Sequence, residues 1–505
     1  MPSELTIAAP TVGWNFDHSY SQLPPLLHKP QHPVPVKAPR LVILNRPLAQ
    51  SLGLNPEVLA LPEHVGTLAG NGIPAGASPL AQAYAGHQFG YFTVLGDGRA
   101  LILGEHLTPT GQRVDIQLKG SGRTPFSRRG DGRAALGPML REYIISEAMQ
   151  ALGIPTTRSL AVVSTGETII RERLLPGAVL TRVAASHIRV GTFQYAAARG
   201  DDETLRALAD YTLARHYPQA LAADHPYLAL LSGVIERQAT LVAQWLQVGF
   251  IHGVMNTDNM AISGETIDYG PCAFMDTYDP GTVFSSIDHD GRYAYGNQPH
   301  IAQWNVARFA ETLLPLLHPE PEQAIALAET ALSTFATHFQ EQWQTRMGAK
   351  LGLLTQEAAD VTLIQDWLAL LHTLRADFTN TCRDLARYVA PGLVPDGDHA
   401  PLPPSPFFQD AAVQNWIQRW HDRLARQPQP LAAVQERIKA HCPARIPRNH
   451  RVEAAITAAV DQDDLTVMEQ LLQALADPYA DVPDDDPYRE LPPPSDRIYQ
   501  TFCGT

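Results

Sequence analysis

The chain has 505 residues, of which 45% are hydrophobic and 18% are charged, and its formal net charge is -14. This length allows more than one hydrophobic core, and the composition is that of a globular protein rather than a disordered one. The negative charge argues against nucleic acid or an anionic membrane as the main partner, because phosphate binding requires a positive field.

Neither a membrane segment nor a secretory signal is predicted. No run of about 18 apolar residues occurs, and the first ten residues lack the basic and apolar regions of a signal peptide. The four cysteines, at positions 272, 382, 442 and 503, form no CxxC pair, which favours a reducing cytoplasm over a disulfide framework. We therefore expect a cytoplasmic protein, and we expect a monomer.

The first half of the chain begins with a segment rich in proline and glycine, residues 1–79, which we interpret as an N-terminal wrapping segment. Tyr91–Leu95 and Arg99–Glu105 flank Gly96-Asp97-Gly98, a pattern that predicts a tight hairpin. Val114–Lys119 alternates apolar and polar residues, as a half-buried strand does.

A helix is predicted over Ala134–Leu152, where apolar residues recur every four positions before a stop at Gly153 and Pro155. Three further strands are expected at Leu160–Ser164, Thr168–Leu174 and Ala178–Val183. Beyond His187 the pattern is mainly helical and includes a long helix that ends near Gly249.

The C-terminal part is helical again after about residue 351, with breaks at 391–406 and 428–430, and 478–494 is an acidic, proline-rich strap. We divide the chain into the wrapping segment (1–79), a strand-rich lobe (80–185), a helical lobe (186–350) and a C-terminal helical extension (351–505). This order of elements predicts a two-lobed α+β fold.

The motif with the most chemical content is His252–Asn259, followed by Asp268-Tyr269-Gly270. Its spacing is that of the catalytic core of a protein-kinase-like phosphotransferase, in which an aspartate, an asparagine and a second aspartate act as base and metal ligands. Asn259 and Asp268 stand at the metal-ligand positions and offer the oxygen ligands that Mg²⁺ or Mn²⁺ prefers. Val254 stands at the base position and cannot accept a proton, which leaves Asp258 as the nearby carboxylate.

Upstream residues fit a phosphate site. Lys119 ends a predicted strand, and Glu142 lies on the following helix, an arrangement that pairs a phosphate-binding lysine with a glutamate in kinases. The loop 120–133 contains four arginines and four glycines and can cradle phosphates. Arg182 and Arg189 are further candidates. The Gly96 turn is either a plain hairpin turn or a place where backbone amides approach a phosphate.

Four longer motifs resemble the selenoprotein-O family of pseudokinases: Tyr84–Gly90, Asp115–Arg128, His252–Asn259 and Ile446–His450. The resemblance covers nearly the whole chain. It implies a protein-kinase-like fold that binds ATP in a flipped orientation and transfers AMP, rather than phosphate, to Ser, Thr or Tyr hydroxyls of proteins. Some bacterial members are described as transferring UMP from UTP as well, with Mn²⁺.

The resemblance also implies a role for individual residues. Asp258 would accept the proton, and Asn259 and Asp268 would bind the metal. Glu142 would pair with Lys119. Nucleotide contacts would come from Gly96, Gly98, Arg99, Lys119, Asp131, Gly132, Arg182, Arg189 and Asp268. In some bacterial relatives a cysteine after the Asp-x-Gly motif pairs with one near the C-terminus, which here implies a Cys272–Cys503 disulfide.

Three functions remain open at this point: a protein nucleotidyltransferase, a phosphotransferase that uses Asp258 as its base, and an inactive nucleotide-binding scaffold. The first explains Val254 best. AMP transfer requires attack at the α-phosphorus, so that pyrophosphate leaves, and Lys119 with the arginine loop would neutralise that large anion.

Overall fold

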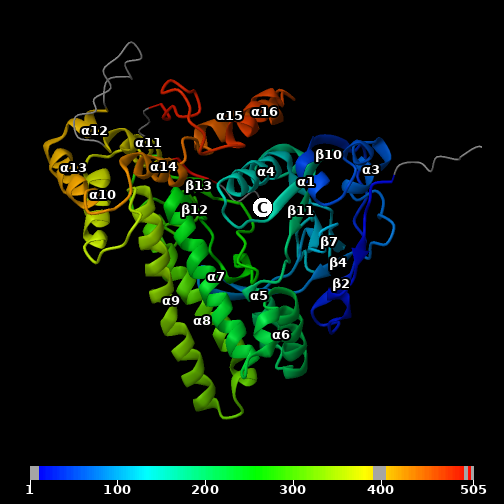
Figure 1. Ribbon diagram of the computed structural model, residues 1–505. Coiled ribbons are helices and arrows are strands. Elements are labelled where there is room, and N and C mark those ends of the chain that lie inside the picture. Colours follow the sequence, from blue (N-terminus) through cyan, green and yellow to red (C-terminus); the bar gives the residue numbers. More distant parts are fainter. Residues whose placement is uncertain (1–10, 390–404, 494–498, 502–505) are drawn as a thin grey trace, which may run out of the picture.

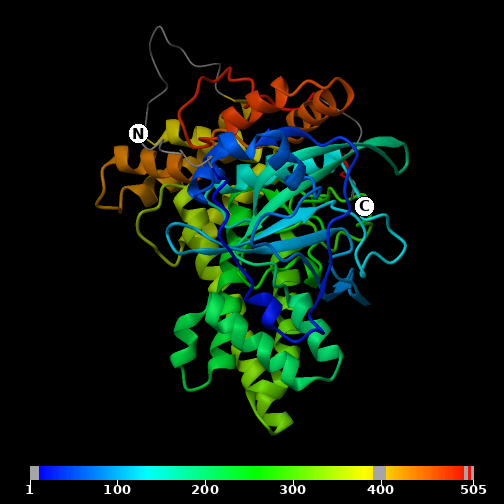
Figure 2. The ribbon, with the colours of Figure 1, turned by 90° about the vertical axis from the view of Figure 1, so that its right-hand side faces the viewer.

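The computed structural model describes residues 11–389, 405–493 and 499–501. It combines a large antiparallel sheet with many helices (Figures 1 and 2). The nine-stranded sheet has the main path β2-β4-β7-β8-β11-β10-β3, while β1 pairs with β7 and β9 with β11. Its strands are β1 (Phe16–Asp17), β2 (His28–Pro30), β3 (Arg40–Leu44), β4 (Leu80–Gln82), β7 (Ala100–Leu107), β8 (Arg113–Lys119), β9 (Ala134–Ala135), β10 (Arg158–Ile170) and β11 (Leu174–Ala184).

Helices bury both faces of this sheet. Val162 of β10 packs into the core that contains α4 (Leu136–Ala151), whereas its neighbour Val163 packs into the core that contains α1 (Arg46–Ser51), α2 (Pro56–Leu59) and α3 (Pro62–Leu68). Because successive side chains of a strand point to opposite faces of the sheet, β10 contributes residues to two hydrophobic cores. The N-terminal segment supplies one helical layer and both end strands of the main path, β2 and β3.

The hairpin predicted around Gly96 is wrong. β6 (Tyr91–Val94) pairs with β5 (Ala85–Gln88) in a separate two-stranded sheet, and β7 pairs with β8 instead. The link between β6 and β7 is fixed by Asp97, whose N–H donates to Gln82 O at 2.9 Å and whose Oδ2 accepts from Gln82 N at 3.1 Å. These bonds to β4 carry the chain from the small sheet into the large one.

The strand predicted before the arginine loop and the helix after it are confirmed as β8 and α4. The three strands predicted next form two long ones, β10 and β11, instead. Gly166, at the expected first turn, has φ +66° and lies where the register shifts between Ser164 and Thr168. It thus produces a bulge rather than a chain reversal.

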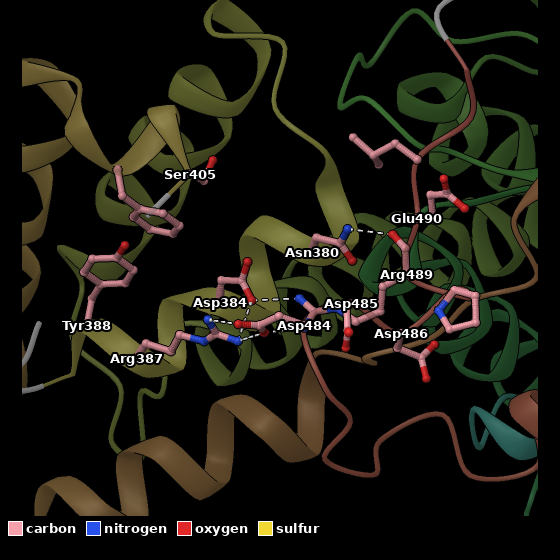
Figure 3. A pocket seen from close by; sticks show the side chains of 13 residues that line it. Asn380, Asp384, Arg387, Tyr388, Ser405, Asp484, Asp485, Asp486, Arg489 and Glu490 are labelled. Atoms are coloured by element: carbon pink, nitrogen blue, oxygen red, sulfur yellow. Dashed lines mark hydrogen bonds and ion pairs between the residues drawn. The ribbon is translucent and has the colours of Figure 1, made fainter. Parts of the chain in front are cut away.

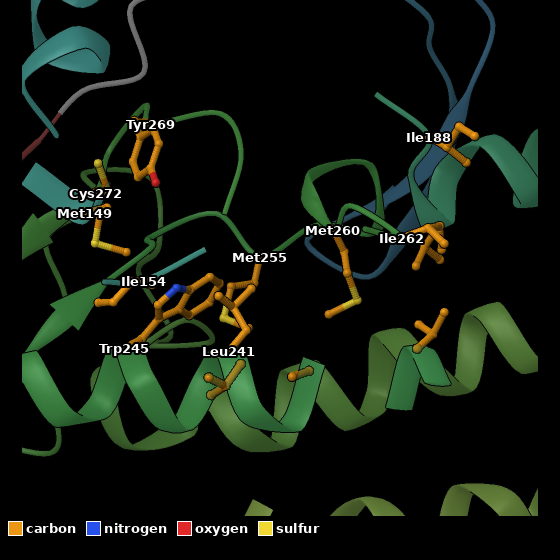
Figure 4. Close-up of a cluster of buried hydrophobic side chains, with 14 of the residues drawn as sticks. Met149, Ile154, Ile188, Leu241, Trp245, Met255, Met260, Ile262, Tyr269 and Cys272 are labelled. Carbon is orange, nitrogen blue, oxygen red and sulfur yellow. The ribbon is translucent and has the colours of Figure 1, made fainter. Parts of the chain in front are cut away.

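The helical part begins with α5 (Val190–Ala198), α6 (Asp202–His216), α7 (Pro226–Val248), α8 (Gln298–Leu317) and α9 (Pro321–Lys350). The predicted end of the long helix is confirmed, because α7 stops at Gly249 in the left-handed conformation (φ +76°). Leu241 and Trp245 of α7 belong to the same buried cluster as Met255, Met260 and Ile262, as Figure 4 shows. This apolar floor anchors the segment that carries the kinase-like motif.

The C-terminal extension contains α10 (Asp360–Thr373), α11 (Phe378–Asp384), α12 (Pro406–Gln409), α13 (Ala411–Leu424), α14 (Leu431–His441), α15 (Asn449–Asp461) and α16 (Thr466–Leu475). Trp367, Trp416 and Trp420 are buried in its core. In the described ranges, no helix has both the length and the apolar character that crossing a bilayer requires.

Two sets of polar contacts hold the acidic strap and Tyr499 against the helices. In the acidic strap, Asp484 accepts from Arg387 and from Arg489, which also donates to Asp384 at 2.8 Å (Figure 3). In α4, Arg141 pairs with Glu453 of α15 and donates to Tyr499 Oη at 3.1 Å. Helices α15 and α16 therefore pack against the same helix that carries Glu142.

Candidate functional site

A pocket of about 400 Å³ unites the predicted site residues. It lies between the strands of the large sheet and the segment that carries the kinase-like motif. The residues predicted to contact nucleotide or metal all line it, namely Gly96, Gly98, Arg99, Lys119, Asp131, Gly132, Arg182, Arg189, Asp258, Asn259 and Asp268. Positions that are far apart in the sequence thus meet at one place.

Three cations converge on one carboxylate in this pocket. Asp268 Oδ1 accepts from Lys119 Nζ at 2.8 Å and from Arg182 at 2.6 Å, and Asp268 Oδ2 accepts from Arg189 at 2.5 Å. Burial alone would raise the pKa of Asp268, but Arg182, Lys119 and Arg189 outweigh it and hold that pKa well below its usual value. The backbone of Asp268 is left-handed (φ +63°), a strained conformation for a residue other than glycine.

Buried acceptors behind the cluster hold these cations in place. Lys119 donates to Glu142 Oε2 at 2.6 Å, so the two residues that were expected to pair are in contact. Arg182 donates to Glu142 Oε1 at 3.1 Å and to Gln117 Oε1 at 2.6 Å. Glu142 itself lines no part of the pocket surface and acts from the α4 side. Such fixed, buried positive charge suits phosphate groups.

Asp258 lies on a 3-10 turn, Thr257–Asn259, and its carboxylate atom Oδ1 is buried with no hydrogen-bond partner among the described residues. Burial raises the pKa of Asp258 to about 6, against the lowering effects of Arg189 and a hydrogen bond with Gln88. Asn259 donates its amide N–H to Val254 O at 3.0 Å, which orients its amide oxygen as the remaining ligand atom.

The small hairpin β5-β6 covers this turn. His87 N donates to Thr257 Oγ1 at 2.7 Å, and Phe89 N donates to Asn256 Oδ1 at 3.1 Å. Gly86 lies so close to the carboxylate that an added Cβ atom would stand 2.2 Å from Asp258 Oδ1. No functional role was predicted for Gly86, although it lies inside the motif Tyr84–Gly90.

The arginine loop contributes less directly than its composition suggests. Arg128 and Arg133 line the pocket, whereas Arg123 lies on the exposed surface. Arg133 donates to Val34 O and Pro35 O, both at 3.0 Å, and so ties the loop to the N-terminal segment.

Several lining residues had not been predicted. The side chain of Asp131 is held by Arg171, at 2.8 and 3.0 Å. Tyr84 lies under the Arg189 guanidinium, at 4.7 Å from the ring centroid. Asp97 is buried, and burial raises its pKa to about 6. Tyr84 and Asp97 stand inside sequence patterns noted above and Arg171 does not, but no local pattern indicates that these three residues line the pocket.

The link between β11 and α5 is held by a buried network next to the pocket. Asp115 Oδ2 accepts from His187 N at 2.9 Å and contacts His187 Nδ1 at 3.0 Å, while Arg215 donates to Asp115 Oδ1 and to Ala185 O, both at 2.6 Å. Burial lowers the pKa of His187 to about 4, although Asp115 favours its charged form.

Acid should therefore destabilise the fold through His187. Its pKa in the folded state, about 4, lies below the ordinary value of 6.5, so the unfolded chain binds the extra proton and stability is lost as pH falls from 6.5 toward 4. We expect His187→Gln to flatten the decrease of the urea midpoint between pH 7 and pH 4.5. The exposed His300→Gln variant should follow the wild type, and an unchanged slope in His187→Gln would refute the assignment.

Comparison with known proteins identifies relatives over nearly the whole length. The family model described as protein adenylyltransferase SelO matches residues 13–476. A protein nucleotidyltransferase YdiU from Syntrophotalea carbinolica is 61% identical over 493 residues, covering 98% of both chains. Proteins of the same name from Geobacillus kaustophilus and Brevibacillus brevis are 61% and 60% identical, covering 98% and 99% of this chain and 99% and 100% of their own.

Proposed function

The chain belongs to the SelO family of protein adenylyltransferases and is a protein nucleotidyltransferase that transfers AMP to proteins, and on this premise we propose how its pocket works. The acceptors are Ser, Thr or Tyr hydroxyls, ATP is the donor, and UTP is a second donor. The observation that carries the proposal is the meeting of a buried cation cluster with Asp258, a carboxylate that keeps one oxygen without a partner.

Asn259 and Asp268 would hold a divalent cation, Mg²⁺ or Mn²⁺. Within the described residues no group of three or more His, Cys, Asp or Glu side chains could hold an ion by itself. The two oxygen donors nevertheless fit a hard cation that completes its shell with nucleotide phosphates. When bound, the metal would supply charge stabilisation at the phosphates.

The residues of the chain would then divide the reaction as follows. Asp258 accepts the proton of the acceptor hydroxyl while that oxygen forms a bond to the α-phosphorus. The bond from the α-phosphorus to the oxygen bridging to the β-phosphorus breaks, and pyrophosphate leaves with that oxygen. Lys119, Arg182 and Arg189 stabilise the negative charge that develops on the leaving group.

The kinase-like arrangement is part of the same proposal. The large sheet with α4 would form one lobe and the helices from α5 to α9 the other, with the pocket between them. Support comes from the order of Lys119, Glu142, Asn259 and Asp268 along the chain and from their convergence in space. The boundaries at residues 79, 185 and 350, and the monomeric state, stay predictions.

Incubation with ATP labelled at either phosphate tests the reaction. We expect label in an acceptor protein from α-³²P-ATP and none from γ-³²P-ATP, and Asp268→Ala should remove the signal because the cation cluster loses its shared carboxylate. Label from γ-³²P-ATP alone would indicate a phosphotransferase, and label from neither an inactive scaffold. α-³²P-UTP in a parallel reaction checks UMP transfer.

A redox tether between Cys272 and Cys503 is also proposed. Cys503 lies outside the described residues, but Thr501 Oγ1 donates to Pro271 O at 2.6 Å, which brings the tail to the residue preceding Cys272. We expect mass spectrometry of the oxidised full-length protein to find a Cys272–Cys503 peptide. The crosslink should persist in Cys442→Ser and vanish in Cys503→Ser. Alkylation of both cysteines in oxidised wild-type protein would exclude the tether.

A further inference from the structure

The hairpin β5-β6 presents an apolar edge to solvent beside the pocket. Tyr91, Phe92 and Val94 are 79%, 46% and 47% exposed. Within the described residues, β6 pairs with β5 and with no other strand. An edge that is both apolar and unpaired is one that most proteins protect, so its exposure at this place requires an explanation.

The hydrogen-bond pattern of the hairpin shows which groups face outward. Leu95 N donates to Tyr84 O at 2.9 Å, so that pair is a hydrogen-bonded one. Bonded and non-bonded pairs alternate in an antiparallel ladder. The N–H and C=O groups of Val94 and Phe92 therefore point to the open edge, where an additional strand can pair with them.

The hairpin is attached to the catalytic turn on its other side. The strand register places Tyr91 opposite Gln88 and Thr93 opposite Gly86. Gly86 lies against Asp258, and Gln88 lines the same pocket as Asp258. A strand added to β6 would lie about 10 Å from β5, a gap that about three residues of extended chain can span.

An arginine adjoins the apolar edge. The ring of Phe92 lies 5.3 Å from that of His87, which lies 5.2 Å from Trp304, and the Arg292 guanidinium stands 5.0 Å from the Trp304 centroid. No ion pair joins Arg292 to a carboxylate in the described residues, whereas Arg308, on the same tryptophan, pairs with Glu311 at 2.7 Å. Arg292 thus offers a positive charge beside the tip of the hairpin, where a Cβ atom added to Gly90 would stand 3.9 Å from its guanidinium carbon.

We propose that the open edge of β6 is the docking site for the acceptor segment of the protein substrate. The segment binds in extended form as an added strand, with an apolar side chain on Phe92 and Val94 and an acidic residue near Arg292. This inference rests on the proposed function, since only transfer to a protein requires a polypeptide here. Strand addition supplies affinity through main-chain bonds, and the charge supplies selectivity.

Binding of synthetic peptides tests the docking site without relying on catalysis. The probe is a fluorescein-labelled nonapeptide with valines at alternate positions and two aspartates, in which alanine replaces the residue with the acceptor hydroxyl. The comparison peptide is identical except that lysines replace the two aspartates. By fluorescence anisotropy we expect the wild-type protein to bind the aspartate peptide about tenfold more tightly than the lysine peptide. Arg292→Glu should reverse this preference, and Val94→Pro, which removes an outward N–H, should weaken binding of both peptides.

Matched variants separate docking from general surface effects. Arg206→Glu removes an arginine that is likewise stacked on an aromatic ring, Tyr227, and Ile325→Asp changes an exposed apolar residue of α9. Both should bind like the wild type. Equal affinity for the two peptides, or unchanged binding in Arg292→Glu and Val94→Pro, would overturn the proposal. If a tyrosine-containing version binds but takes no label from α-³²P-ATP, the proposed function fails instead.

Discussion

Replacing Asp258 by asparagine is expected to slow AMP transfer by about 10²–10⁴-fold, the range typical of a lost general base. The variant keeps the size of the side chain but cannot accept a proton. Nucleotide affinity should change little, because Arg189 donates to the main-chain oxygen of Asp258, at 2.6 Å, and not to its carboxylate. The effect should therefore appear in kcat.

Single-turnover labelling with α-³²P-ATP measures this rate, and equilibrium binding of a non-hydrolysable ATP analogue measures affinity separately. Asp290→Asn serves as the control, because it alters an exposed carboxylate of a nearby loop. Retention of more than about a tenth of the wild-type rate in Asp258→Asn would exclude Asp258 as the base.

Gly86→Ala is expected to lower kcat by about 10²-fold without removing any reactive group, since displacing a catalytic group by about 1 Å has an effect of that size. The new Cβ atom would stand 2.2 Å from Asp258 Oδ1, so either β5 or the carboxylate has to move. The same labelling assay measures the loss.

Gly66→Ala is the matched control, because its Cβ atom would meet only Asn71 Cβ at an ordinary 3.9 Å. Thermal unfolding of both variants should show that each is folded. Full activity in Gly86→Ala would show that the hairpin does not position Asp258.

The sequence predicts the parts of the fold that depend on local patterns. The alternation of β8, the four-residue period of α4 and the glycine after α7 each lie within one element, and all three are confirmed. Which strands pair with one another could not be predicted from such local patterns. β6 turns back on β5 at Phe89 and Gly90, whose φ angles are both positive. Asp97 then bonds to Gln82 of β4, a contact that the Gly96-Asp97-Gly98 turn pattern does not reveal.

The candidate site likewise contains residues that local motifs predict and residues that they do not. Lys119, Asp258, Asn259 and Asp268 could be named because they stand in long motifs whose residue types match a chemistry. Gly86 could not, because its importance comes from the missing side chain and from a carboxylate 172 positions later. The residues proposed to touch a ligand were therefore easier to predict than the residues that shape the space around them.

The packing of α15 and α16 on α4 bears on how this enzyme can be controlled. Many kinase-like proteins are switched off when the helix that bears the glutamate swings outward and separates it from the lysine. Here Arg141, the neighbour of Glu142, is joined to Glu453 and Tyr499. Rotating α4 would first require breaking these contacts, so the inactive conformation of such a switch should be scarcely populated.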